Sequence, residues 1–424
     1  MLPKDENELL TRVGPGTPMG ALMRRYWQPV AATEEMDDRW TKRIRVLGED
    51  LVLFKDEGGS FGLIAEICPH RRVSLAFGIP TENGIRCAYH GWAFDKTGRC
   101  VDQPNEGPRH ALRDKIATIA YPVQEMGGLL WAYLGPAPVP LLPRFDGFVV
   151  DKAIRTVASA EIPCNWLQIM ENSVDPVHVE TLHGRVSEFH GKQKGIKHLA
   201  LAKRHVKIAF DEFEYGIIKR RLLEGQSEDS QDWTVGHPLV FPLMVAIGTM
   251  GTLWQQYSFE IRVPIDDTNT RHYWYNAFLP PAGSIVPERL LTRTHWYEQP
   301  YRDKNGEYLM EFVPAQDVAM WITQGPIASR DKESLGQSDV GVVQYRRMLK
   351  REIEKVERGE DPLGTVRDPA KNQMIVLPIE AGKYINFDGF RRLMITNMLY
   401  SPIVNDLLKV FEGADAPELE TAGV

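Results

Sequence analysis

The spacing of apolar residues predicts two kinds of structure along the chain. From about residue 43 to 135, short apolar runs alternate with turn sequences such as KDEGGS and PTENG; the runs are IRVL, LVLF, FGLIAEI, GIRCAYHGWAF and GGLLWAYL. Runs of this length, bounded by Gly, Asp, Asn and Pro, are typical of short strands joined by tight turns. This part of the sequence therefore predicts a small all-β domain.

The segments on either side of the β pattern are different in character. Thr17 can cap a short helix, Pro18 suits its first turn, and ALMRRYW continues it, so residues 1–40 are interpreted as an N-terminal helical segment. The sequence GPAPVPLLPRF at 135–145 contains too many prolines for a strand or a helix interior. We expect a linker there, which ends an all-β domain at 41–145.

Beyond the linker the sequence mixes helical and strand patterns. Residues 160–183 predict a helix, and strand-like alternation follows in HVKIAF, YGIIKRRLL, LWQQYSFEIRV and RHYWYNAFL. Helical composition returns in EFVPAQDVAMWITQ and VVQYRRMLKREIEKVERGE. The fold class expected is α+β, with an α+β domain at 146–412 and a weakly apolar, flexible tail at 413–424.

Composition narrows the class of protein. The 424 residues are 43% hydrophobic and 25% charged with a net charge of −7, which fits a globular protein and argues against nucleic-acid or anionic-membrane partners. The start, MLPKDENELL, lacks the apolar core of a signal peptide. The longest uncharged stretch, 237–254, is interrupted by Pro238, Pro242, Gly248 and Gly251, so it predicts buried strands. We expect a soluble, cytoplasmic protein.

Two pairs of metal-binding residues lie in the β pattern. Cys68, His70, Cys87 and His90 form the spacing C-x-H-x16-C-x2-H, with each pair just after a predicted strand. Two thiolates and two imidazoles could hold a tetrahedral zinc, or a [2Fe–2S] cluster in which cysteines bind one iron and histidines the other. A histidine as the second member of each pair favours the cluster. The remaining thiols are interpreted as ordinary core residues: Cys100 and Cys164.

A second constellation lies in ENSVDPVHVETLH at 171–183. Asp175 and His178 are three apart and share a helix face, whereas His178 and His183 are five apart and would point about 140° from each other on a regular helix. Both histidines can reach one ion only if the helix contains a π-type turn or breaks just after His178. Pro176 makes such a distortion expected.

This second site needs a third ligand before it predicts a reaction. Two imidazoles and one carboxylate, with open positions, form the facial triad of non-haem Fe(II) oxygenases, but the same donors with water could serve a zinc-dependent hydrolase. The chain has 57 acidic residues, so composition cannot identify the carboxylate.

The two motifs together resemble a known family. CPHR followed by CAYHGWAFD resembles the Rieske domain of ring-hydroxylating oxygenases, and NWLQIMENSVDPVHVETLH is similar to the iron-binding helix of the same enzymes. The resemblance is closest to the phthalate dioxygenase group, which uses only α-type (terminal oxygenase) subunits, and it covers most of the chain. It implies a Rieske [2Fe–2S] domain followed by a helix-grip catalytic domain with an antiparallel sheet.

The resemblance also implies roles for individual residues. His178 and His183 match the ligands of a mononuclear Fe(II), and Asp317 in AQDVAMW matches the third ligand. Asp175 matches an aspartate that accepts a hydrogen bond from a cluster histidine of the neighbouring subunit. Asn172 matches a position near the iron that does not ligate strongly.

The reaction implied is oxygenation of an aromatic compound in a catabolic pathway. Electrons would come from an NAD(P)H-dependent reductase of flavin or ferredoxin type, and they would cross a subunit boundary in a homotrimer or in stacked trimers. HPLVFPLMVAIGTM and WYNAFL supply apolar walls for a substrate cavity. The weak candidates for contacting an acidic substrate are Lys207, Arg220 and Arg221. We expect mono- or cis-dihydroxylation of an aromatic carboxylate or a larger apolar aromatic acid, with O-demethylation as the alternative. A pure electron carrier would leave the region after the linker without a role.

Overall fold

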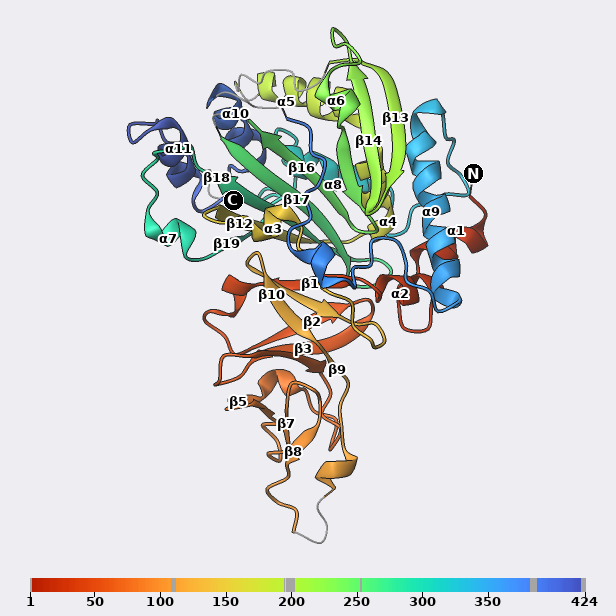
Figure 1. Cartoon of the computed structure of the whole chain (residues 1–424), viewed down its shortest axis with the longest axis vertical. Helices are drawn as coiled ribbons and strands as arrows, with labels where there is room; N and C mark the ends of the chain where they lie inside the picture. The colour runs from red at the N-terminus through yellow and green to blue at the C-terminus, as the bar shows by residue number, and fades with distance from the viewer. Residues whose placement is uncertain are drawn as a thin grey trace.

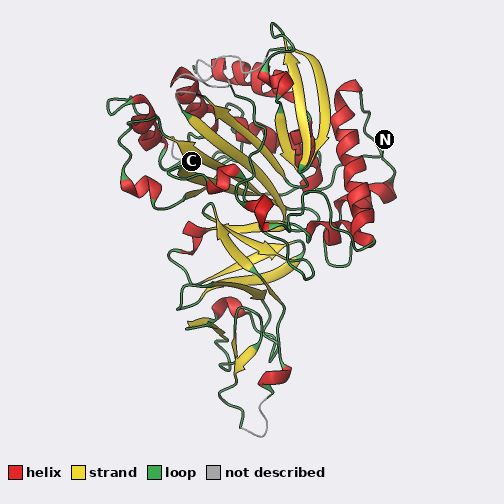
Figure 2. Cartoon of the chain, viewed as in Figure 1, coloured by secondary structure: helices red, strands yellow, loops and turns green. Residues whose placement is uncertain are grey.

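Three small sheets and one large sheet divide the chain into a narrow and a broad part (Figure 1). The computed structural model describes residues 2–107, 112–193, 195, 203–251, 254–381 and 387–420. Figure 2 shows that strands dominate the narrow part, whereas the long helices belong to the broad part. The structure is therefore α+β, as the sequence predicts.

The N-terminal segment contains helices and one strand. Helix α1 (Lys4–Thr11) precedes α2 (Pro18–Met23), whose first turn is capped by Thr17: its Oγ1 accepts a hydrogen bond from the Gly20 N–H at 3.1 Å. The predicted helix is confirmed, but the chain continues as strand β1 (Trp27–Ala32), which the sequence did not predict. All of β1 is buried, so it lacks the apolar–polar alternation that reveals a half-exposed strand.

The β pattern folds into short antiparallel sheets. One sheet has the order β1–β11–β10, with β10 at Val123–Met126 and β11 at Leu129–Tyr133. The second contains β2 (Thr41–Val46), β3 (Glu49–Lys55), β4 (Phe61–Ala65) and β9 (Ala120–Tyr121). The third contains β5 (Ile79–Thr81), β6 (Gly84–Arg86), β7 (Ala93–Phe94) and β8 (Cys100–Asp102). The third sheet lies at the narrow end of the molecule (Figure 1).

The proline-rich segment 135–145 forms neither helix nor strand, as predicted, and only Phe145 makes an isolated bridge, to Ile375. The large sheet follows, in the order β13–β14–β15–β16–β17–β18–β12–β19. Its strands are β12 (Ile154–Ile162), β13 (His205–Phe213), β14 (Gly216–Leu223), β15 (His237–Val240), β16 (Met244–Met250), β17 (Gln255–Pro264), β18 (Thr270–Leu279) and β19 (His295–Glu298). Every pairing is antiparallel except that of β12 with β19. The uncharged stretch from residue 237 therefore forms buried strands, as predicted; residues 252 and 253 lie outside the described residues.

The helix predicted for 160–183 begins later than expected. Residues 160–162 end β12, and Asn165 then caps α4 (Trp166–Val174) by accepting a hydrogen bond from the Leu167 N–H at 3.0 Å. Pro163 separates the two elements because it cannot donate to the sheet. The helices predicted near 311–324 and 342–360 are confirmed as α8 (Val313–Thr323) and α9 (Val340–Glu357).

The remaining helices lie in the connections between strands and near the C-terminus. The shorter ones are α3 (Asp146–Val149), α5 (Ser187–Gln193), α6 (Gln231–Thr234) and α7 (Glu288–Leu291). Near the C-terminus, α10 (Phe387–Asn397) and α11 (Val404–Glu412) contribute to an apolar cluster with Trp254 and Phe278. Short 3₁₀ turns lie at Thr33–Met36, Leu75–Phe77, Arg113–Lys115, Gln337–Asp339 and Pro369–Asn372.

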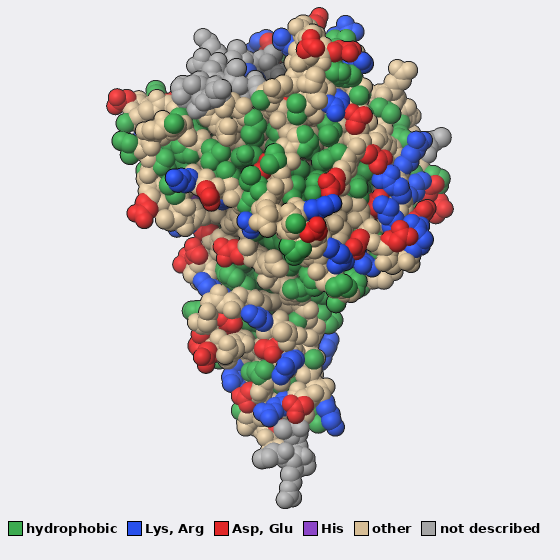
Figure 3. Space-filling model, viewed as in Figure 1, with side chains coloured by type: hydrophobic (Ala, Val, Ile, Leu, Met, Phe, Trp, Pro, Cys, Tyr) green, Lys and Arg blue, Asp and Glu red, His purple; other side chains and the backbone are tan. Residues whose placement is uncertain are grey.

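Helix α9 is amphipathic, with charged side chains toward solvent on the face shown in Figure 3. Two of them form ion pairs with other elements: Lys350 with Glu6 at 2.8 Å and Arg351 with Glu212 at 2.9 Å. Among the described residues, no helix is both long and apolar enough to cross a bilayer.

Candidate metal centres and substrate cavity

Two similar loops in the narrow part carry the Cys and His pairs. One follows β4 and the other follows β6. In each loop the cysteine C=O accepts a hydrogen bond from the N–H four residues later: Arg72 to Cys68 at 3.1 Å and Gly91 to Cys87 at 3.0 Å. Arg72 and Gly91 both have positive φ, 63° and 77°, a conformation that costs glycine little. Each tight turn thus holds the cysteine and the histidine of one pair on the same short loop.

The donors of these loops separate into a buried and a half-buried pair. Both thiols are buried, whereas His70 and His90 are half-buried with ring centroids 4.7 Å apart. Burial, with a contribution from the neighbouring Cys87, raises the pKa of the Cys68 thiol to about 11. A thiolate therefore needs a compensating cation here.

The same donors do not converge on one ion. In the described part of the chain, some groups of three or more metal-binding side chains have ligand atoms that all lie within 4.8 Å of one another. Cys68, His70, Cys87 and His90 do not form such a group. A tetrahedral zinc would require that convergence. Two thiols on the buried side and two imidazoles nearer the surface fit a cluster of two irons better.

The second constellation begins where α4 ends. Asp175 leaves the helical conformation (φ −80°, ψ 118°), and its carboxylate accepts hydrogen bonds from the N–H groups of Val177 at 2.8 Å and His178 at 3.2 Å. A π-helix, η4 (Val179–Val186), then begins directly after His178. The predicted π-type turn is confirmed, and the break lies before His178 rather than after it. Hydrogen bonds from i to i+5 bring residues five apart toward the same face.

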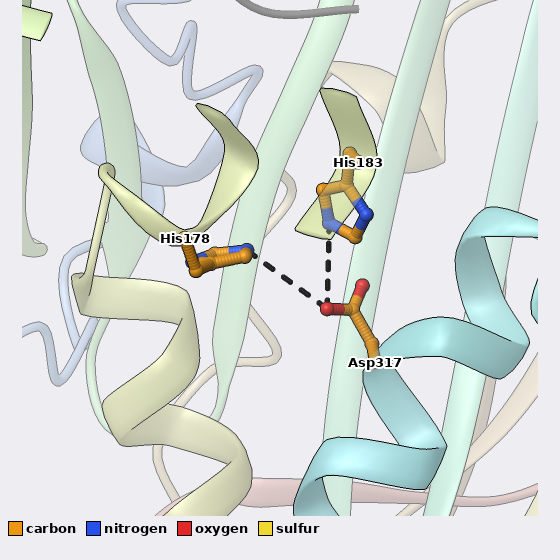
Figure 4. A group of neighbouring side chains, drawn as sticks. All are labelled: His178, His183 and Asp317. Atoms are coloured by element: carbon orange, nitrogen blue, oxygen red, sulfur yellow. Dashed lines mark ion pairs between the residues drawn. The ribbon is translucent and has the colours of Figure 1, made fainter. Parts of the chain in front are cut away.

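His178, His183 and Asp317 lie together (Figure 4). Helix α8 packs against η4 and carries the carboxylate to the histidines. The Oδ1 atom of Asp317 is 3.4 Å from Nε2 of His183 and 3.9 Å from Nε2 of His178. The two rings are 5.1 Å apart and nearly perpendicular, at 81°. This arrangement presents two imidazole nitrogens and one carboxylate oxygen to a common point.

The other ring nitrogens are held by acceptors. Nδ1 of His183 lies 2.9 Å from Oε1 of Gln316, and Nδ1 of His178 lies 3.3 Å from Oδ2 of Asp175. The Gln316 amide N–H₂ donates to Ser187 Oγ at 2.8 Å, which fixes its carbonyl oxygen toward the imidazole. Protons on both Nδ1 atoms leave lone pairs on both Nε2 atoms, as metal ligation requires. The sequence did not identify Gln316; its only signal was its position beside Asp317.

The electrostatics of His178, His183 and Asp317 favour a negative charge on Asp317 and a positive charge on His183. Burial alone would raise the pKa of Asp317, but the charges of His183 and His178 outweigh burial and lower it. Burial would lower the pKa of His183, and Asp317 outweighs that effect and raises it. The site therefore stabilises positive charge beside the carboxylate, which is the property that a divalent cation needs.

Glu171, the first residue of the motif, has a separate role. Its carboxylate accepts three hydrogen bonds from Arg330, at 2.9, 3.1 and 2.7 Å, and one from Arg346 at 2.6 Å. All three side chains are largely buried. Charge-assisted bonds of this kind fix α4 against α9 and the segment after α8. Glu171 therefore holds α4 in place rather than joining the group formed by His178, His183 and Asp317.

The metal-binding group lies on the wall of a cavity of about 220 Å³. Asn172 also lines it. The two predicted walls contribute Val245, Ile247, Gly248, Thr249, Trp274 and Asn276. The cavity is thus a partly apolar chamber that opens onto the metal donors.

Positively charged side chains line the cavity, but of the three proposed from the sequence only Arg221 is among them. Strand β14 presents Lys219 and Arg221 to it, whereas Arg220, on the opposite face, pairs with Asp211 at 2.5 Å. Lys207 lies outside the cavity lining, with 48% of its side chain exposed, and pairs with Glu228. Lys219 was missed, although it and Arg221 are two residues apart and so share one face of the strand.

Comparisons with known proteins identify the family to which the chain is related. Residues 26–122 match the family of the Rieske [2Fe-2S] domain, and residues 291–381 match the LigXa C-terminal domain. The oxygenase subunit of 5,5'-dehydrodivanillate O-demethylase from Sphingobium sp. is 41% identical over 89% of this chain and 87% of its own length. The oxygenase subunit of phthalate 4,5-dioxygenase from Pseudomonas putida is 34% identical over 86% of this chain and 89% of its own.

Solved structures share the fold at lower identity. The Pseudomonas putida CBB5 protein NdmA, as a mutant with theobromine, has a TM-score of 0.60 at 18% identity and covers 81% of this chain and 94% of its own. Dicamba monooxygenase bound to dicamba has a TM-score of 0.57 at 17% identity over 80% of this chain and 99% of its own. At these identities the likeness supports the fold alone.

Proposed function

The chain belongs to the Rieske-type oxygenases, and we propose on that basis that it is a terminal oxygenase for an aromatic acid, with His178, His183 and Asp317 as the ligands of its mononuclear iron. The observation that carries this proposal is the convergence of these three side chains at the wall of the cavity. Membership of this family sets aside the zinc-dependent hydrolase and the pure electron carrier.

The chain supplies residues that fit both cofactors of the family. Cys68, Cys87, His70 and His90 would hold the [2Fe–2S] cluster. When bound, the cluster supplies electrons one at a time and the iron activates O2 beside the substrate. The electrons come from a reductase or ferredoxin partner, which we propose to be NAD(P)H-dependent.

The residues around the iron site orient the ligands and enclose the substrate. Gln316 and Asp175 hold the imidazoles with Nε2 toward the metal. The apolar part of the cavity wall, with Val245, Ile247 and Trp274, would exclude water from the reacting face once substrate is bound. Lys219, whose Nζ donates to the Ser173 C=O at 2.7 Å, lies where it can attract an acidic substrate to the end of α4.

The proposal also includes a subunit contact. In this account Asp175 accepts a hydrogen bond from His70 or His90 of a neighbouring copy, in a homotrimer or in stacked trimers. Asp175 is suited to this because 21% of its side chain remains exposed while it caps the turn before η4. Asn172, on the cavity wall, would orient substrate or O2 without ligating the iron.

O-demethylation is the second candidate reaction. It is favoured by the 41% identity to a demethylase subunit, against 34% to the phthalate dioxygenase subunit. Hydroxylation of the ring and of a methoxy carbon both need the same iron site, so the difference lies in which carbon the cavity presents.

The test is oxygen uptake by the purified protein with a reductase and a panel of benzoic, methoxybenzoic and biphenyl acids, followed by identification of the products. We expect uptake that depends on an aromatic acid and yields a hydroxylated or demethylated product. His190, which lies in α5 outside the metal group, provides the matched control. His190→Ala should retain uptake and His183→Ala should lose it. Equal uptake by both variants would contradict the assigned iron site.

A further inference from the structure

One end of the cavity is lined by uncharged polar side chains that the metal centres do not use. Four alternate residues of β17 face the cavity: Gln256, Ser258, Glu260 and Arg262. Burial raises the pKa of Glu260, and the charges of Asp317 and His183 also act on it, so Glu260 lies toward the proposed iron ligands. Gln256 is four residues from Glu260, which is about 13 Å along an extended strand. The Gln256 end of the cavity is therefore remote from the iron ligands.

The orientation of the Gln256 amide is set by a chain of hydrogen bonds. Nδ2 of Asn276 on β18 lies 3.4 Å from the sulfur of Met398 and 3.5 Å from Oγ1 of Thr156. A thioether can accept but cannot donate, so the amino group of Asn276 faces Met398 and its carbonyl oxygen points the other way. That oxygen, Oδ1, accepts a hydrogen bond from Nε2 of Gln256 at 2.7 Å. The amide nitrogen of Gln256 is thereby turned toward Asn276, and its oxygen is turned away.

Oε1 of Gln256 is the group that this arrangement leaves for a ligand. In the described part of the chain it accepts no hydrogen bond. It is also not one of the fully enclosed atoms without a partner, in contrast to Oγ1 of Thr249 on the neighbouring strand. Since Gln256 lines the cavity and only 5% of it is exposed, the open surface of this oxygen faces the cavity.

An uncharged acceptor in this position selects the chemistry of its ligand. An amide oxygen can accept from a hydroxyl or from an amide N–H, whereas a carboxylate cannot donate to it. The cations of the cavity lie elsewhere: Arg262 is at the other end of β17, and Lys219 and Arg221 are on β14, three strands away in the sheet. Ser258 and Asn397 add only uncharged polar groups. This end of the cavity therefore favours a neutral donor over a second acid group.

We propose that Gln256 is a specificity-determining residue whose Oε1 accepts a hydrogen bond from a neutral donor on the substrate, with Asn276 holding the amide for that purpose. The proposal deepens the proposed function and rests on it. The substrate class becomes aromatic acids that carry one acid group and, away from the reacting carbon, one hydroxyl or amide N–H. Asn276 is a positioning residue in this account, because its oxygen and its amino group are both engaged by protein partners.

The experiment compares ligands of similar shape that differ in the group presented to Gln256. The iron- and cluster-loaded protein, without reductase, is titrated calorimetrically with benzoate, with its three carbamoyl derivatives and with the three matching dicarboxylates. For at least one ring position, the wild type should bind the carbamoyl derivative about 3- to 10-fold more tightly than benzoate, which is the effect of one net hydrogen bond. The dicarboxylate of the same ring position should bind more weakly than benzoate.

Two variants of Gln256 separate the role of its oxygen from that of its shape. Gln256→Met keeps the length of the side chain and removes the acceptor, so the affinity ratio of the carbamoyl derivative to benzoate should fall to about one. Gln256→Glu keeps an acceptor at the same place, so it should retain the ratio, and its charge should weaken the binding of the dicarboxylate further. Gln255→Met, on the opposite face of β17, should behave like the wild type.

The pattern across these proteins decides the proposal. A preference for the carbamoyl derivative in the wild type and in Gln256→Glu, lost in Gln256→Met, would support it. No preference at any ring position in the wild type, an unchanged ratio in Gln256→Met, a lost ratio in Gln256→Glu, or binding of none of the ligands would each overturn it. If Gln256→Met does not fold, the wild type and Gln256→Glu still give the decision. Binding is measured without turnover, so an absence of oxygen uptake across the acid panel would count against the proposed function and leave this ratio intact.

Discussion

At the scale of single residues, the iron site depends on which nitrogen of each imidazole carries a proton. Gln316 and Asp175 accept from the Nδ1 atoms, and Asp317 lies beside the Nε2 atoms. The three proposed ligands alone do not fix this arrangement, since a free imidazole can exchange its tautomer and rotate. The acceptors behind the ligands therefore set how well the site binds a metal.

The first prediction concerns Gln316. Gln316→Leu should keep the packing of α8 but leave Nδ1 of His183 without its acceptor, so affinity for Fe(II) should fall by about 10- to 100-fold. Titration of metal-free protein with Fe(II) measures this. Gln324→Leu, at the exposed end of the same helix, should bind iron like the wild type. The same affinity in both variants would show that Gln316 does not orient the imidazole.

The metal-binding residues that lie close together in the sequence were the most predictable part of the site. Cys68, His70, Cys87 and His90 could be identified because each pair lies within one turn of chain. Gln316 and Lys219 could not, because their importance depends on which face of α8 or β14 meets the cavity. That depends on packing between distant segments, which local spacing does not encode.

At the scale of elements, the central feature is the change from α4 to the π-helix η4. The sequence predicted the distortion from Pro176 and from two histidines five residues apart. It did not show that Asp175 caps the next turn through Val177 and His178. Asp175 thus combines a cap, a contact to His178 and the proposed bridge to a neighbouring subunit.

The second prediction separates these roles of Asp175. In Asp175→Asn the amide oxygen can take the place of Oδ2 and accept from the His178 N–H and Nδ1, so iron content should stay close to the wild-type level although the bond from the Val177 N–H is lost. The lost charge weakens the hydrogen bond to a cluster histidine, so electron transfer should be slower. The measurement starts from chemically reduced protein, adds substrate and O2, and follows the return of the oxidised visible spectrum. An equally fast return would rule out the bridge, and loss of iron would show that Asp175 is needed to bind the metal, either through its contact with His178 or as a ligand in place of Asp317.

Other elements show where sequence patterns lose information. Strand β1 is buried on both faces, so it lacks the apolar–polar alternation that would have identified it. The first residues of the helix predicted at 160–183 belong instead to β12, which ends just before Pro163. Long amphipathic or capped helices such as α9 and α2 were predictable because their signals are local. Helices α10 and α11 were not predicted, and they belong to an apolar cluster that forms only with Trp254 and Phe278 in place.

At the scale of the whole molecule, the two metal-binding groups lie in different parts of the chain. The Cys and His loops belong to the narrow part, and His178, His183 and Asp317 belong to the broad part, on the wall of the cavity (Figures 1 and 4). Because the two groups are separate, a substitution in one of them should disable electron supply or substrate oxidation without removing the metal of the other. The order of the strands in the large sheet, by contrast, could not be read from the sequence, because distant pairings such as β12 with β18 have no local signature.

The most direct test of the account uses Asp317→Ala in a single turnover without reductase. The cluster is reduced chemically, substrate and O2 are added, and the visible spectrum is followed alongside iron analysis. The wild type should regain its oxidised spectrum quickly and form product. Asp317→Ala should show the full cluster spectrum, lack the mononuclear iron, and regain the oxidised spectrum slowly without product, whereas Asp229→Ala, at an exposed turn, should behave like the wild type. Fast recovery with product in Asp317→Ala would contradict the account.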